Sequence, residues 1–135
     1  MKNILLLLST ALTLVACAPA LQAVQPNERA TLTRDGQSLV LTNPGPDALT
    51  GDPTAPSDGV ALTIDGSDAL LLDAQGQKWC TVEKKSFGSR WSCKLPTIAP
   101  NTRLRVAWLG GTVNDAAGLA YRPSSDATQI VIWLK

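Results

Sequence analysis

Three cysteines and a complete absence of histidine decide which chemistry this chain of 135 residues can perform. The cysteines are Cys17, Cys80 and Cys93. Histidine is the usual general base near neutral pH and the commonest metal ligand. Its absence excludes Ser-His-Asp and Cys-His nucleophilic pairs as well as histidine-bound zinc or copper. Two thiols without further ligands do not close a zinc site. We therefore expect no enzyme, no metal centre and no cofactor.

Cys17 stands at the end of an apolar N-terminal segment. Lys2 precedes a nearly unbroken apolar run over residues 4–15, which ends in Leu14-Val15-Ala16-Cys17. This layout resembles a bacterial lipoprotein signal peptide with its lipobox. The resemblance implies that residues 1–16 are removed and that the Cys17 thiol carries a lipid. The protein would then be held at a membrane outside the cytoplasm, as part of the cell envelope.

Two other interpretations of this segment are a transmembrane helix and a plain secretory signal. The transmembrane helix is disfavoured, because it needs about 20 apolar residues and the run is shorter. A plain secretory signal would be cut after Ala16 or Ala20. Ala18, rather than an aspartate, follows the cysteine. That residue resembles the pattern that permits export to the outer membrane, if the host has one.

The chain after the expected cleavage site is the size of one domain and is electrically neutral. It has 119 residues with 11 acidic and 11 basic side chains, and this balance argues against a nucleic-acid partner. Residues 17–76 hold eight acids and two bases, whereas residues 77–135 hold three acids and nine bases. The acidic and the basic half of the chain either neutralise each other's charge within the fold or form one acidic and one basic face that a partner can bind. Residues 17–29, with two prolines, are interpreted as the lipidated cysteine and a tether.

From residue 30 to residue 135 the pattern is β, and no window of helical length has a 3.6-residue apolar period. Asp35-Gly36 is a strong hairpin signal, and the four prolines of residues 43–59 indicate a long loop. Strands are expected at 30–34, 37–42, 60–64, 69–73, 78–84, 89–95, 103–109 and 128–134. About eight short strands predict an all-β fold, a single Ig-like antiparallel β-sandwich.

Cys80 and Cys93 remain after lipidation, and an oxidising exterior favours a disulfide between them. If they lie directly opposite each other, the hairpin that joins them has an apolar face and a polar face. The apolar face holds Cys80, Val82, Trp91, Cys93 and Leu95. The polar face pairs Trp79 with Lys94, Thr81 with Ser92 and Glu83 with Arg90. We expect a buried Trp91 and an exposed Trp79, with Trp108 and Trp133 in the core.

The C-terminal half resembles a bacterial Ig-like domain of the SbsA-like type, which is repeated in S-layer and adhesin proteins. The similarity lies in residues 95–108, with the turn Pro100-Asn101-Thr102, and in residues 110–120, with Asp115-Ala-Ala-Gly118. Residues 69–76 resemble an earlier strand of that family. The family's entry strand and its Phe-x-Thr ending have no match here, and the disulfide hairpin is not one of its hallmarks. The resemblance implies a structural or adhesive module without catalytic residues, and it implies turns at Asn101 and Gly118.

A basic and aromatic hairpin is the candidate binding surface. Its residues are Trp79, Lys84, Lys85, Phe87, Arg90 and Lys94, with Lys78 beside them. These side chains suit a sugar ring, an acidic glycan or another anionic ligand. The alternative is that Trp79 packs on Lys94 and that the lysines keep a sheet edge soluble. A calcium site at Asp47, Asp52 and Asp58 is the weaker interpretation, because aspartate next to glycine or proline is ordinary turn chemistry.

These features predict a lipid-anchored envelope protein that acts by binding. We expect it to be a structural or binding accessory subunit of an envelope or surface-layer assembly, with an envelope or S-layer protein as its partner. The alternative is a glycan-binding or anion-binding module that uses the Trp79 hairpin. A hydrolase that uses paired carboxylates is the third and weakest hypothesis.

Overall fold

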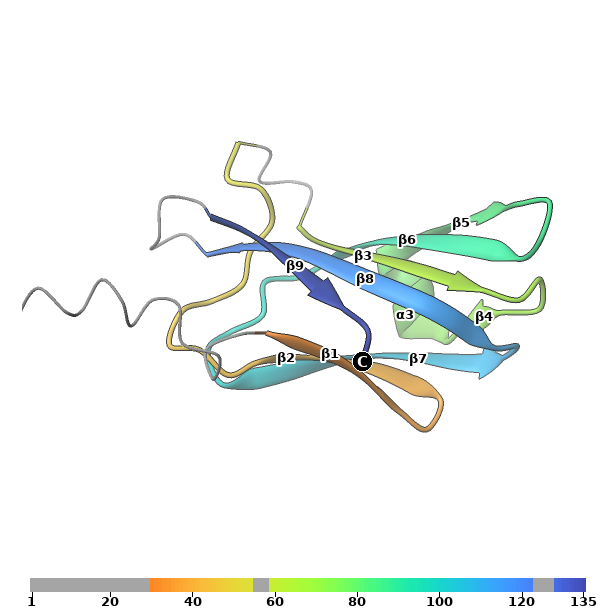
Figure 1. The fold of residues 1–135 in the computed structure, drawn as a ribbon, viewed down its shortest axis with the longest axis horizontal. Helices are drawn as coiled ribbons and strands as arrows, with labels where there is room; N and C mark the ends of the chain where they lie inside the picture. The colour runs from red at the N-terminus through yellow and green to blue at the C-terminus, as the bar shows by residue number, and fades with distance from the viewer. Residues whose placement is uncertain (1–29, 55–58, 123–127) are drawn as a thin grey trace, which may run out of the picture.

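A computed structural model describes residues 30–54, 59–122 and 128–135 of the chain. The predicted signal peptide, lipidation site and tether at residues 1–29 lie outside the described residues. Two antiparallel sheets pack face to face, as Figure 1 shows, so the all-β sandwich prediction is confirmed.

The first sheet has four strands in the order β1-β2-β7-β4. The strands are β1 (Thr31–Asp35), β2 (Ser38–Asn43), β7 (Thr102–Gly110) and β4 (Leu71–Leu72). The predicted hairpin is present, because Asp35 pairs with Ser38 and Gly36 has a positive φ of 57°. Glycine adopts such a left-handed turn conformation without steric cost.

The second sheet has five strands in the order β5-β6-β3-β8-β9. The strands are β5 (Cys80–Lys84), β6 (Ser89–Leu95), β3 (Val60–Gly66), β8 (Val113–Arg122) and β9 (Thr128–Trp133). Side chains alternate between the two faces of a strand, and β3 follows this rule throughout. Its residues Val60, Leu62 and Ile64 face the core, while Ala61, Thr63 and Asp65 face outward and are half-buried.

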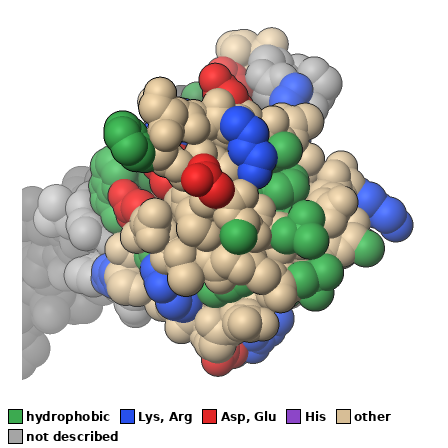
Figure 2. Space-filling model, turned by 90° about the vertical axis from the view of Figure 1, so that its right-hand side faces the viewer, with side chains coloured by type: hydrophobic (Ala, Val, Ile, Leu, Met, Phe, Trp, Pro, Cys, Tyr) green, Lys and Arg blue, Asp and Glu red, His purple; other side chains and the backbone are tan. Residues whose placement is uncertain are grey.

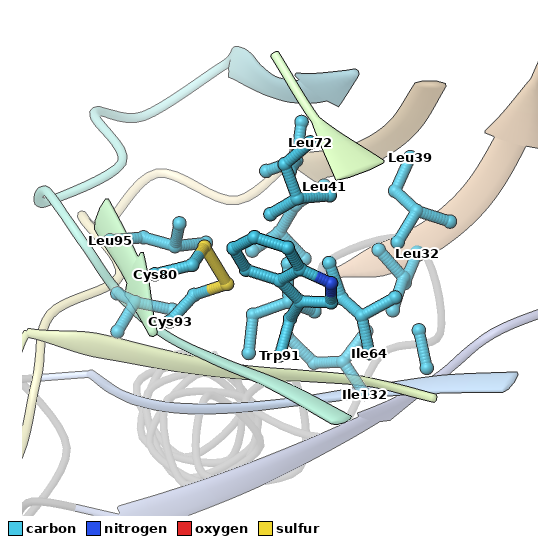
Figure 3. Close-up of a cluster of buried hydrophobic side chains, with 14 of the residues drawn as sticks. Leu32, Leu39, Leu41, Ile64, Leu72, Cys80, Trp91, Cys93, Leu95 and Ile132 are labelled. Atoms are coloured by element: carbon cyan, nitrogen blue, oxygen red, sulfur yellow. A yellow bond between two sulfur atoms is a disulfide. The ribbon is translucent and has the colours of Figure 1, made fainter. Parts of the chain in front are cut away.

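The core lies between the sheets and contains leucines from both of them. Leu32, Leu39 and Leu41 of the first sheet meet Ile64, Leu95 and Ile132 of the second, with Trp91 among them (Figure 3). The two sheets also join at one edge, where Leu32 forms a parallel bridge with Leu134. The amide of Lys135 donates a hydrogen bond of 3.0 Å to the carbonyl oxygen of Leu32. This bridge brings the last described residues next to β1.

A short helix replaces part of the strand expected at 78–84. Helix α3 spans Ala74–Trp79, and the strand after it begins only at Cys80. The carboxylate of Asp73 accepts a hydrogen bond of 2.8 Å from the amide of Gly76, which caps the first turn. Helices are predicted from a 3.6-residue apolar period, and a helix of six residues is too short to show one.

The turn expected at Asp115–Gly118 is also absent, whereas the turn at Asn101 is present. Asn101 has a positive φ of 56°, a conformation that asparagine tolerates. Gly118 instead lies inside β8, between β3 and β9, where it pairs with Leu62 on one side and Ile132 on the other. Pairing on both sides keeps this segment extended. With β8 included, the described residues form nine strands rather than eight.

Candidate functional site

The cysteine hairpin has the predicted register. Cys80 and Cys93 lie opposite each other on β5 and β6 and form a disulfide, with a Cα–Cα distance of 3.9 Å. The ring of Trp91 lies beside this disulfide in the core, and its Nε1 donates a hydrogen bond of 3.3 Å to the carbonyl oxygen of Leu70 (Figure 3). The predicted disulfide and the predicted burial of Trp91 are therefore confirmed.

Trp79 lies outside the two strands of this hairpin and is half-buried, so its predicted exposure is wrong. It is the last residue of α3, it is half-buried, and it packs against the core. The helix ends just before β5 begins, so Trp79 never enters the strand whose alternation would have turned it outward.

The tip of the β5–β6 hairpin carries three of the other candidate residues. Phe87 is 97% exposed there, and Lys84 and Lys85 stand beside it in the sequence. The Nζ atom of Lys84 donates a hydrogen bond of 2.7 Å to the carbonyl oxygen of Asp68, and the Asp68 carboxylate accepts one from the amide of Gly88. These bonds hold the tip against the turn after β3. The structure thus separates the six candidate residues into the tip, the outer sheet face with Arg90 and Lys94, and the half-buried Trp79.

Two further expectations about burial are wrong. Val82 is 44% exposed although it lies opposite the buried Trp91, because β5 is an edge strand and only its first residue reaches the core. Trp133 is 66% exposed, while its neighbour Ile132 is buried. All four residues from Ile130 to Trp133 are apolar, so the sequence did not reveal which alternate pair faces inward.

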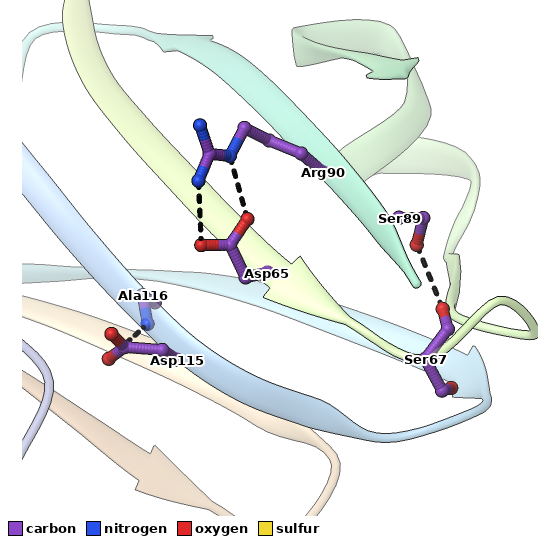
Figure 4. A network of polar contacts seen from close by, with 6 residues as sticks. All are labelled: Asp65, Ser67, Ser89, Arg90, Asp115 and Ala116. Atoms are coloured by element: carbon purple, nitrogen blue, oxygen red, sulfur yellow. Dashed lines mark hydrogen bonds and ion pairs between the residues drawn. The ribbon is translucent and has the colours of Figure 1, made fainter. Parts of the chain in front are cut away.

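Arg90 pairs with Asp65 of β3 and not with Glu83, although Glu83 lies opposite it on β5. Its Nε and Nη2 atoms donate hydrogen bonds of 2.7 and 3.1 Å to the two carboxylate oxygens of Asp65 (Figure 4). This bidentate arrangement is the strong form of the guanidinium–carboxylate contact. The hydrogen bond from Arg90 lowers the pKa of Asp65, and the same contact raises the pKa of Arg90.

A shallow hollow of about 210 Å³ lies on the outer face of the five-stranded sheet, next to this ion pair. Its lining comes from β6, β3, β8 and β9, four neighbouring strands. The lining residues are Thr63, Asp65, Arg90, Asp115, Ala116, Ala117 and Trp133. Of the predicted binding residues, only Arg90 contributes to it. The remaining residues were missed because they come from segments far apart in the sequence.

Two cross-strand rows of side chains build the hollow. Arg90, Asp65 and Asp115 are consecutive neighbours across β6, β3 and β8. In the adjacent row, Thr63, Ala117 and Trp133 are consecutive neighbours across β3, β8 and β9. Neighbours on one face of a sheet lie close enough to interact. The small side chains of Thr63 and Ala117 therefore leave a depression between the indole on one side and the charged row on the other.

Asp65 and Asp115 are directly opposite each other, an arrangement that destabilises a sheet unless it is compensated. Arg90 compensates the charge of Asp65, and the Asp115 carboxylate accepts a hydrogen bond of 2.9 Å from the amide of Ala116 (Figure 4). Such a pair of carboxylates is not by itself a metal site. Within residues 30–54, 59–122 and 128–135, no three His, Cys, Asp or Glu side chains gather closely enough to hold a metal ion.

Among the residues that the structure describes, no group of carboxylates supports the weaker interpretation of a calcium site. Asp58 lies outside the described residues. The carboxylate of Asp52 accepts hydrogen bonds of 2.9 and 2.7 Å from the amide and hydroxyl groups of Thr54, and these bonds lower its pKa. Asp52 thus takes part in an ordinary turn of the Asx type.

The end of the molecule that carries the hairpin tip is chemically mixed. Figure 2 views this end and shows hydrophobic side chains among basic and acidic ones. In the part of the chain that the structure describes, no helix is long and apolar enough to cross a bilayer.

The sequence matches no protein-family model, and neither a curated protein nor a solved structure matches it.

Proposed function

We propose that this protein is a lipid-anchored component of the bacterial cell envelope and that its β-sandwich acts by binding, as an accessory subunit of an envelope or surface-layer assembly. The observation that carries the proposal is the outer face of the five-stranded sheet. Trp133 is 66% exposed there, beside a hollow with a charged rim. Tryptophan is one of the residue types that most often carry the binding energy of an interface.

The location rests on two features that agree. The segment that ends in Leu14-Val15-Ala16-Cys17 resembles a lipobox, which would place the mature chain outside the cytoplasm. The disulfide between Cys80 and Cys93 suits that compartment, because disulfides persist where the surroundings are oxidising.

Binding is a better account of the hollow than catalysis by paired carboxylates. A hydrolase of that kind needs one carboxylic acid with a raised pKa as its general acid. Arg90 has the opposite effect on Asp65, since its hydrogen bonds lower the pKa of this carboxyl group. Asp65 thus stays ionised and paired with Arg90, which excludes it as the general acid of such a pair.

The experiment that tests the proposal is crosslinking in intact cells, followed by recovery of the tagged full chain from the envelope fraction. We expect the wild-type chain to sediment with membranes and to recover one defined envelope partner. Cys17→Ser should release the chain from the membrane fraction and lose the partner, because no lipid can be attached. The purified variant should unfold at the same temperature as the wild type.

Either of two results would contradict the proposal. One is a Cys17→Ser chain that stays with the membrane fraction, which would remove the lipid anchor. The other is a wild-type chain recovered alone at every detergent strength, which would remove the accessory-subunit role.

A further inference from the structure

We propose that the hollow on the five-stranded sheet is a subsite for one uncharged sugar ring of an envelope polysaccharide. This inference rests on the proposed binding function and assigns a ligand class to it. It moves the expected sugar contact from Trp79, which is half-buried, to Trp133, which is 66% exposed.

Trp133 supplies the apolar surface that a sugar needs. The C–H face of a pyranose ring packs on an aromatic ring, and tryptophan offers the largest rigid ring at a small cost in side-chain entropy. The cross-strand neighbour of Trp133 is Ala117, whose methyl group leaves room beside the indole. The indole therefore stands at one edge of the hollow, above a floor of small side chains.

The opposite rim supplies the polar contacts. Arg90 uses its Nε atom and one N–H group of Nη2 on Asp65, which leaves further guanidinium N–H donors. The carboxylates of Asp65 and Asp115 each keep acceptor capacity beyond the hydrogen bonds described above. Adjacent hydroxyl groups of a sugar both donate and accept hydrogen bonds, so a fixed row of donors and acceptors matches them. The bidentate ion pair holds this row in place before any ligand arrives.

Charge and size narrow the class of ligand. The rim has two carboxylates and one guanidinium, an excess of one negative charge that disfavours phosphate, uronic acids and other anions. This argues against an anionic ligand in the hollow, whereas the basic hairpin led us to expect one. A volume of about 210 Å³ lies below the range of about 300–1,000 Å³ that is typical of pockets for drug-sized ligands. We therefore expect one sugar unit in the hollow and a Kd of about 1 mM for it.

Weak binding at one subsite is consistent with a membrane-anchored protein. When many copies on one membrane face a repeating polymer, several of them bind the same polymer chain. The first contact raises the effective concentration of the remaining sugar units for the neighbouring copies. The polymer, rather than the free monosaccharide, is thus the expected ligand.

The test uses the full chain in detergent and surfaces that carry neutral, acidic and amine-bearing saccharides. We expect retention on neutral saccharides and at least a tenfold loss of it for Trp133→Ala. Val131→Ala is the matched control, because Val131 is 51% exposed, faces outward on the same strand and does not line the hollow. Both variants should unfold at the wild-type temperature, since each replaces an exposed side chain.

Three results would overturn this proposal without touching the proposed function, which crosslinking tests separately. Equal retention of wild type and Trp133→Ala would place the sugar elsewhere. Retention on amine-bearing saccharides alone, if salt weakens that retention, would show that the hollow binds a cation. The carboxylates and the face of the indole would then attract the ammonium group. No retention of the wild type on any saccharide would exclude a sugar subsite, even if an envelope partner is captured.

Discussion

The ion pair between Asp65 and Arg90 connects the stability of the sheet with the shape of the hollow. Both side chains are partly exposed, at 39% and 40%, so the contribution of the pair to stability at neutral pH is small. Its effect on position is larger, because two hydrogen bonds fix the plane of the guanidinium against the carboxylate. The same contact lowers the pKa of Asp65, and this makes the pair visible in the pH dependence of unfolding.

We expect the stabilisation by Asp65 to disappear in acid. The folded-state pKa of this carboxyl group is below its unfolded value of about 3.9, so the stabilisation is complete above about pH 5 and is lost as the pH falls through the folded pKa. Asp65→Asn should therefore be less stable than the wild type at neutral pH, and the difference should shrink below about pH 4. Urea unfolding at a series of pH values measures this difference.

Glu83→Gln is the control for that prediction. It removes the same charge from the other cross-strand neighbour of Arg90, but Arg90 gives its hydrogen bonds to Asp65. We expect Glu83→Gln to have the smaller effect at neutral pH. A difference between Asp65→Asn and the wild type that does not change from neutral to acid pH would show that the ion pair does not lower the pKa of Asp65.

At the level of strands and helices, the sequence predicted an element where some feature of the residues fixed its register or its inward face. It failed where no such feature was present. The register of β5 on β6 followed from two cysteines, because a disulfide between opposite residues leaves no freedom for a strand to slip. Helix α3 was missed because six residues cannot display a helical period. The outward direction of Trp133 was missed because β9 has apolar residues on both faces, and only the packing of Ile132 settles which face is inside.

The β5–β6 hairpin depends on its disulfide. β5 is an edge strand with a single partner, and its last four residues are exposed, so little packing holds it. The disulfide closes a loop with a sequence separation of 13, and the chain-entropy model gives a stabilisation of about 3 kcal/mol for a loop of this size. We expect a reductant to lower the free energy of unfolding by about that amount, as measured by chemical denaturation.

The double variant Cys80→Ala, Cys93→Ala supplies the control. It should be destabilised by a similar amount, and the reductant should then have no further effect. If the reductant lowers the stability of this variant as much as that of the wild type, the loss does not come from the disulfide.

At the level of the whole molecule, the sequence was sufficient for the class of fold and not for the site. Alternating strands and turn residues predict a sandwich of two antiparallel sheets, and the structure has one. The hollow depends on the strand order β6-β3-β8-β9, which brings together Asp65, Arg90, Asp115 and Trp133. Strand order is a long-range property, and no local pattern at any of these four residues encodes it.

The parallel bridge between Leu32 and Leu134 has a mechanical consequence. Trp133 directly precedes Leu134, and Leu32 lies in β1, the first strand after the proposed tether. When the membrane anchor and a polymer held at Trp133 move apart, tension passes from β9 to β1 through this bridge and the hydrogen bond between Lys135 and Leu32. The disulfide hairpin lies at the far edge of the sheet, outside that path. Single-molecule pulling between residue 17 and residue 133 should give the same rupture force with the disulfide oxidised or reduced; a clear drop on reduction would show that the load passes through β5 and β6.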